Sequence, residues 1–305
     1  MIQRNTNYSI KIKHDYLINH TNMGYLGALP RGNSLEIFGF IASIIIGILL
    51  GLVGGGGSIL TVPILVYLFG VEPIVATAYS LFIVGISSLV GAFPKYKQGL
   101  INLKTAIVFG IPSIIAVFLA RKLIVPAIPK DVFQVGDFII TKSILLMMLF
   151  AILMVAASVS MIREKKNITN EEPSLQVFNY PLIIFEGFIV GILTGLVGAG
   201  GGFLIIPALV MLSKLPMKMA VGTSLIIIAA KSLIGFLGDL TSNSSAIDWP
   251  LLFMVTGLAI AGIFIGNYLS KFIDGNKLKK GFGWFVLIMG VYIIVSELFK
   301  TGPGH

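Results

Sequence analysis

Long apolar runs separated by short polar breaks fill this chain from Leu35 onward, and they constrain its fold more than any other feature. A helix needs about 20 residues to cross the roughly 30 Å hydrocarbon core of a bilayer. The ten runs cover residues 36–53, 58–69, 74–93, 104–120, 143–162, 180–198, 203–213, 219–237, 250–270 and 281–299. Most approach that length, whereas 58–69 and 203–213 are too short to cross and are typical of broken or re-entrant helices.

The composition favours a membrane protein over the other large classes. Hydrophobic residues make up 56% of the 305 residues and charged residues 11%. That charged fraction is roughly half of the soluble-protein average, so lipid rather than water must cover most of the exterior. The net charge of +9 could suggest nucleic acid, but the basic residues lie between the apolar runs, as membrane loops require. We expect an all-α, multi-pass protein of the cell membrane, with lipid and not nucleic acid as a partner.

Motifs for cofactor or metal chemistry are missing from the sequence. It has no cysteine, and its three histidines (His14, His20 and His305) lie outside the apolar runs, so no His-Glu-x-x-His zinc site exists. No phosphate-binding Gly-x-x-x-x-Gly-Lys motif occurs either. Ser224 and Lys231 could form a Ser-Lys dyad only across two helical turns, about 10 Å along the axis. We therefore expect no cofactor, no metal and no enzymatic activity; an intramembrane enzyme is the less favoured alternative.

The chain contains an internal repeat at an offset of 144 residues, the distance from Gly51 to Gly195. The segment Gly-Leu-Val-Gly-Gly-Gly-Gly-Ser-Ile-Leu-Thr-Val-Pro-Ile-Leu-Val at 51–66 aligns without a gap on Gly-Leu-Val-Gly-Ala-Gly-Gly-Gly-Phe-Leu-Ile-Ile-Pro-Ala-Leu-Val at 195–210. Identities continue through Ser80 and Ser224 to Ser88-Leu89 and Ser232-Leu233. The repeat predicts two homologous halves of one membrane domain, an organisation common in transporters.

The repeat sets the domain boundaries. We expect a polar tail over 1–35, a first half over 36–162, a charged linker over 163–179 and a second half over 180–300. If each short helix returns to the side from which its partner entered, each half has a hairpin plus three crossings. Three is odd, so the halves should be inverted. The break at 238–249 has no lysine or arginine and is predicted outside. The loop 121–142 is also predicted outside. It contains Arg121, Lys122, Lys130 and Lys142, and so many basic residues fit an outside loop poorly.

Two glycine clusters interrupt the apolar pattern where each short helix begins. Glycine inside a helix weakens it by about 1 kcal/mol relative to alanine, so the backbone is expected to unwind there. Unpaired amides at the following helix N-terminus attract anions, and in a membrane they are tolerated only where they line a cavity or are buried in protein. The two clusters thus predict a central anion site. The predicted ligands are Gly56, Gly57, Ser58, Gly200, Gly201 and Gly202. Close helix packing through small residues is the alternative for any single glycine.

The duplicated motif resembles the TauE/SafE sulfite-exporter family, also called the TSUP family. The resemblance rests on Gly-Leu-Val-Gly-x-Gly-Gly-x-x-Leu-x-x-Pro-x-Leu-Val, each copy followed by Ala-x-x-x-Ser-Leu at Ala76 and Ala220, and it spans about 36–300. It implies a polytopic transporter of small sulfur-containing anions such as sulfite or sulfonates. The second copy reads Val-Gly-Thr223-Ser224-Leu and the first reads Thr77-Ala-Tyr79-Ser80-Leu. The first copy therefore has Tyr79 where the second copy has Thr223.

Polar residues within the apolar runs are further candidates for the anion site. Lys231 is expected to be the only cation deep inside a crossing, and it could neutralise an anionic oxygen; alternatively its long stem carries the charge to the interface. The hydroxyls of Thr77, Ser80, Thr223 and Ser224 follow the short helices and can donate to oxygens, or can bond the backbone of their own helix.

The sequence as a whole predicts a carrier for a small anion, working by alternating access at a central site and driven by a coupling ion, H⁺ or Na⁺, or by membrane potential. A passive anion channel has the same sequence features and is the alternative.

Overall fold

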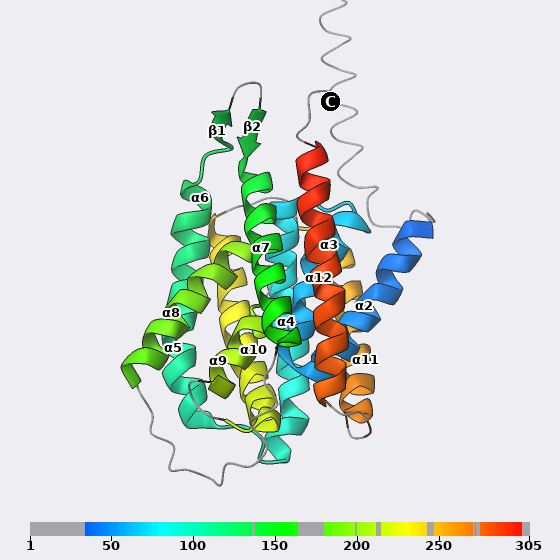
Figure 1. The fold of residues 1–305 in the computed structure, drawn as a ribbon, viewed down its shortest axis with the longest axis vertical. Coiled ribbons are helices and arrows are strands. Elements are labelled where there is room, and N and C mark those ends of the chain that lie inside the picture. The colour runs from blue at the N-terminus through cyan, green and yellow to red at the C-terminus, as the bar shows by residue number, and fades with distance from the viewer. Residues whose placement is uncertain are drawn as a thin grey trace, which may run out of the picture.

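The computed structural model describes residues 34–135, 138–163, 180–198, 200–211, 215–242, 247–270, 272 and 275–300. They form a bundle of helices that run roughly along one direction, with a small β-hairpin at one end (Figure 1). Among these residues, six helices are long and apolar enough to cross a membrane. The chain is therefore a helical, multi-pass integral membrane protein, as expected. Residues 1–33 of the predicted tail and 164–179 of the predicted linker lie outside the described residues.

The elements follow the predicted runs closely. In the first half they are α2 (Ser34–Val53), the 3₁₀ helix η1 (Gly55–Leu60), α3 (Thr61–Tyr67), α4 (Pro73–Lys97), α5 (Leu103–Leu119), the π-helical η2 (Ala120–Ile124), α6 (Val125–Ala127), β1 (Asp131–Val135), β2 (Phe138–Thr141) and α7 (Lys142–Ile162). In the second half they are α8 (Tyr180–Val197), α9 (Gly202–Met211), α10 (Met217–Ser242), α11 (Trp249–Leu269) and α12 (Gly275–Lys300).

The loop predicted for 121–142 is wrong in its first part. Helix α5 continues through η2 and α6, so a single helical segment runs over Leu103–Ala127. Arg121 and Lys122 are helical, and Arg121 is buried with 1% of its surface exposed. The charge of Arg121 ended the predicted run, but an acidic partner from another helix allows it to be buried, as described below. The rest of the predicted loop holds the antiparallel hairpin of β1 and β2.

Helices α4 and α10 pack against each other in opposite directions. Gly85 of α4 lies against Leu233, and Gly91 lies nearer the start of α10, within 3.7 Å of Leu225 when a Cβ is placed on it. At the far end of α4, Lys95 lies against Gly222. As the residue number rises along α4, its contact on α10 therefore falls.

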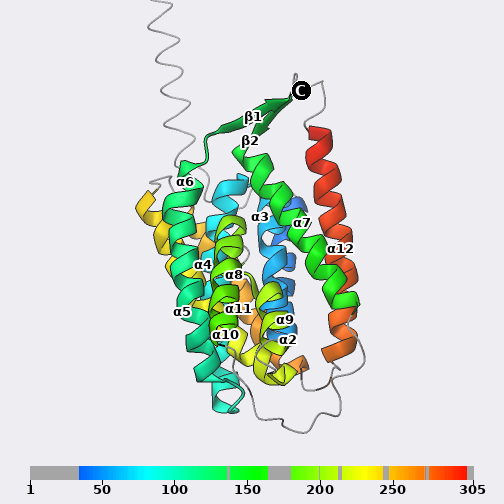
Figure 2. The same ribbon diagram turned by 60° about the vertical axis from the view of Figure 1, so that its left-hand side comes forward.

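Glycine contacts hold two further helix pairs together closely. Gly47 and Gly51 of α2 lie directly against the backbone of α11, and Gly187, Gly191 and Gly195 of α8 lie against α5. Spacing by four residues puts these glycines on one helix face, which lets the helix backbones approach closely. Helices α7 and α12 form a separate pair along one side of the bundle (Figure 2), with Gly290 against Met154 and Val155.

The 3₁₀ helix η1, which leads into α3, and the short helix α9 begin where the two glycine clusters touch. The backbone of Gly55 lies against that of Gly202, so closely that neither position has room for a Cβ. From this contact α3 extends toward the hairpin end of the bundle and α9 toward the opposite end (Figures 1 and 2). The fold therefore brings two broken segments, far apart in the sequence, to one interior point.

Candidate anion site

The break before α9 is built by glycines that adopt left-handed backbone conformations. Gly198, Gly200 and Gly201 have φ angles of 75°, 63° and 68°. Other residues adopt this region only at a cost, so the glycines let α8 stop and α9 start inside the bundle. The amides of Leu204 and Ile205 donate to the carbonyl of Gly201, so only the first two amides of α9 lack a preceding carbonyl. They give this point a positive partial charge.

Lys231 lies beside this break. Its side chain is 1% exposed, and its Nζ donates a hydrogen bond to Thr194 Oγ1 on α8 at 3.0 Å. A Cβ placed on Gly201 would come 2.7 Å from the same Nζ, which shows how close the ammonium lies to the glycine backbone. The ammonium is buried inside the bundle and does not reach the protein surface, which contradicts the alternative that its stem carries the charge to the interface. No carboxylate in the described part of the chain forms an ion pair with it.

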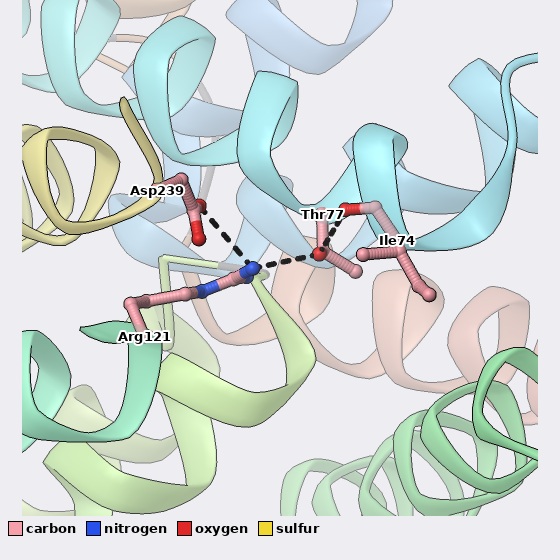
Figure 3. A network of polar contacts seen from close by, with 4 residues as sticks. All are labelled: Ile74, Thr77, Arg121 and Asp239. Carbon is pink, nitrogen blue, oxygen red and sulfur yellow. Dashed lines mark hydrogen bonds and ion pairs between the residues drawn. The ribbon is translucent and has the colours of Figure 1, made fainter. Parts of the chain in front are cut away.

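Arg121 is a second buried cation at the same break, and Figure 3 shows its guanidinium between two other helices. Its Nη1 donates to Thr77 Oγ1 of α4 at 2.9 Å and lies 3.3 Å from Asp239 Oδ2 of α10. Thr77 in turn donates to the backbone oxygen of Ile74 at 2.7 Å. A Cβ on Gly198 would come 2.5 Å from Nη2 of Arg121. Arg121 and Lys231 therefore lie at the two ends of the short segment from Gly198 to Gly201.

Helices α4 and α10, which align in the sequence repeat, each contact the glycine cluster of the other half. Thr77 of α4 packs on Gly198, whereas Val221 of α10, its equivalent at the 144-residue offset, packs on Gly54. Ser87 and Lys231 are equivalent in the same way and are buried. The two buried positions differ in chemistry, because Lys231 carries a charge and Ser87 does not.

The other predicted ligands on the two glycine clusters make different contacts. Gly56 lies within η1, whereas Gly57 packs on the preceding turns of α2. The Ser58 hydroxyl donates to the backbone oxygen of Gly55 at 2.6 Å. Gly200 packs on Val84 of α4, and Gly202 is the first residue of α9.

Three of the predicted hydroxyls differ in how they are used. Ser80 is buried and makes no hydrogen bond within the described residues. Ser224 donates to the backbone oxygen of Val221 at 2.8 Å, the backbone-bonding alternative. Thr223 accepts a hydrogen bond from the backbone amide of Asn102 at 2.9 Å and so ties the start of α10 to the start of α5.

The sequence argument missed Arg121 and Thr194. Arg121 follows an apolar run of normal length, so hydropathy assigned it to a loop. The available signal was Asp239, an acidic residue near the end of another crossing, since buried charges come in pairs. Thr194 had no distinguishing local pattern. Among the described residues, no group of three His, Asp or Glu could hold a metal ion.

A helical bundle that crosses the membrane several times, with broken helices meeting at an interior cationic point, has the architecture of a membrane transporter. Comparison with known proteins agrees with that class and gives the family. Residues 39–293 match the family model described as "Sulfite exporter TauE/SafE", and the chain belongs to this family.

Similar proteins carry names of the same class. A "probable membrane transporter protein" of Methanocaldococcus jannaschii is 31% identical over 271 residues, which cover 84% of this chain and 94% of the relative. A protein of the same name from Xylella fastidiosa is 28% identical over 256 residues, with coverage of 82% and 91%. "Probable membrane transporter protein YunE" of Bacillus subtilis is 28% identical over 277 residues, with coverage of 84% and 95%. No solved structure matches this chain significantly.

Proposed function

We propose that this protein carries a small anion across the membrane by alternating access at the point where the two glycine clusters meet. The observation that carries the proposal is Lys231, a buried ammonium beside Gly201 without a carboxylate partner in the described residues. An uncompensated buried charge costs several kcal/mol, which a bound anion would offset. The amides at the start of α9 favour an anion at the same place.

The substrate class follows from the family. Its description names sulfite export, and a sulfite or sulfonate group is a compact oxyanion that suits an ammonium and backbone amides. We therefore propose sulfite, a sulfonate or a related organosulfur anion as the substrate. Uptake or export follows the imposed gradients, with H⁺ or Na⁺ as the coupling ion.

Alternating access requires two halves that exchange roles, and we propose that the sequence repeat forms an inverted structural repeat. The opposite directions of α4 and α10, which are equivalent in the repeat, support the inversion. The reciprocal packing of Thr77 on Gly198 and Val221 on Gly54 supports a pseudo-twofold relation between the halves.

The test is uptake of radiolabelled sulfite and methanesulfonate into proteoliposomes with imposed pH, sodium and potential gradients. We expect saturable flux in the wild type and a loss of about tenfold or more in Lys231→Met, because methionine fills the volume without the charge. Lys122→Met is the matched control, since this lysine is exposed on the same helical segment as Arg121. Its flux should equal that of the wild type.

Two results would contradict this function. Flux that rises linearly with concentration and never saturates would favour the passive channel. Saturable flux that is equal in Lys231→Met and Lys122→Met would remove Lys231 from the site.

A further inference from the structure

One edge of the Arg121 guanidinium is unused by the protein. Nη1 is occupied by Thr77 and Asp239, whereas Nε and Nη2 are buried and make no hydrogen bond within the described residues. The whole side chain is 1% exposed, so bulk water does not reach these two donors. Leaving buried donors unpaired is unfavourable, and each such group calls for a partner.

The unused edge lies at the break before α9. A Cβ placed on Gly198 would come 2.5 Å from Nη2 of Arg121, so this edge lies against the glycine. The N-terminus of α9, a helix of 10 residues, starts four positions later at Gly202. A fully buried cation with free donors at Gly198 and a helix N-terminus at Gly202 therefore lie at the two ends of one short segment, and each favours an anion there.

The chemistry of the edge selects the kind of anion. Nε–H and Nη2–H are parallel donors in a fixed plane, and this fork matches two oxygens bound to one central atom. A spherical anion such as chloride presents a single acceptor atom, so it takes both donors only through bent hydrogen bonds, which are weaker. A lysine at position 121 would supply the charge without the fork.

We propose that the Nε and Nη2 edge of Arg121 binds two oxygens of the transported oxyanion, and that Asp239 is the counter-ion of Arg121 when no anion is bound. This inference rests on the proposed transport function. It adds Arg121 as a second ligand of the substrate and Asp239 as a competitor of the substrate for Arg121. The Asp239 carboxylate and the substrate share one guanidinium, so the carboxylate weakens substrate binding. Thr77 positions the guanidinium by accepting from Nη1 while it donates to Ile74.

The experiment measures equilibrium binding of radiolabelled sulfite to the purified full chain in nanodiscs, with chloride as a competitor. We expect Arg121→Lys to weaken sulfite binding by about tenfold, the effect of losing one charge-assisted hydrogen bond, while the inhibition constant of chloride stays near the wild-type value. Asp239→Asn is expected to tighten sulfite binding by a similar factor, because the competing charge is gone. Arg163→Lys, at an exposed arginine that follows α7, is the matched control and should change neither value.

The melting temperature of each variant, measured with and without about 10 mM sulfite, shows whether the variant is folded. A ligand that binds only the folded state raises the melting temperature. A larger sulfite-induced rise in melting temperature for Asp239→Asn than for the wild type would support the competition. The inference would be overturned if Arg121→Lys kept the wild-type sulfite affinity and the wild-type selectivity over chloride. Weaker sulfite binding in folded Asp239→Asn would also overturn it. Either result would leave the anion carrier intact. A wild type that binds neither sulfite nor methanesulfonate would instead overturn the proposed function, and this inference with it.

Discussion

At the scale of single residues, the site depends on backbone that only glycine adopts easily. Gly201 combines a φ of 68° with direct contact to Thr194 and Lys231. A side chain there meets a conformational cost and a steric cost together. The same residue therefore sets the path of the chain and the place of the ammonium.

Gly201→Ala is expected to destabilise the protein by about 1–3 kcal/mol, because a residue with a Cβ is strained in the left-handed region. The added methyl group also displaces the ammonium of Lys231, so sulfite binding should weaken even in the folded fraction. Gly257→Ala is the control, since Gly257 lies in α11 with nothing within 4 Å of its Cβ position. Melting temperature and sulfite affinity would be measured for both. Equal melting temperatures in the two variants would disprove the argument.

At the scale of elements, tight helix pairs hold the cations in place. Helix α8 packs on α5 through Gly187, Gly191 and Gly195, and α5 leads directly into the segment that carries Arg121. Thr194, the hydrogen-bond partner of Lys231, lies on the same helix α8. The spacing between α5 and α8 therefore sets where both cations meet the glycine break.

Gly191→Val tests this coupling at the middle of the pair. Even one Cβ at Gly191 would lie 2.5 Å from the backbone oxygen of Ser113, so valine forces the helices apart. We expect a lower melting temperature, by the equivalent of about 1–3 kcal/mol for overpacking, together with weaker sulfite binding. Gly257→Val, on the open surface of α11, should bind sulfite as the wild type does. Normal binding in a stable Gly191→Val protein would show that the spacing does not control the site.

At the scale of the whole molecule, the absence of natural cysteines permits a direct test of inversion. Gln98 follows the end of α4, and Ser242, its equivalent at the 144-residue offset, ends α10. If the halves are inverted, Gln98→Cys and Ser242→Cys react with an impermeant maleimide from opposite sides of the membrane. Lys218→Cys, at the start of α10, is expected to react from the side of Gln98, and Lys130→Cys from the side of Ser242. Reaction of Gln98→Cys and Ser242→Cys from one side would exclude the inverted arrangement.

The sequence by itself determined the features that are local or periodic. The apolar runs predicted the helices because the length of a crossing is set by the bilayer. The glycine clusters predicted where the helices break, and Gly198, Gly200 and Gly201 do adopt conformations that favour glycine. Lys231 stood out because a charge within an apolar run is unusual.

Only the tertiary structure decided which of these residues meet and which charges are neutralised. Arg121 reads as the first residue of a loop, and it becomes a buried part of a helix because Thr77 and Asp239 from two other helices surround it. Thr223 matches the repeated motif but bonds Asn102. Burial of a charge depends on partners that are distant along the chain, and hydropathy within one segment carries no information about them.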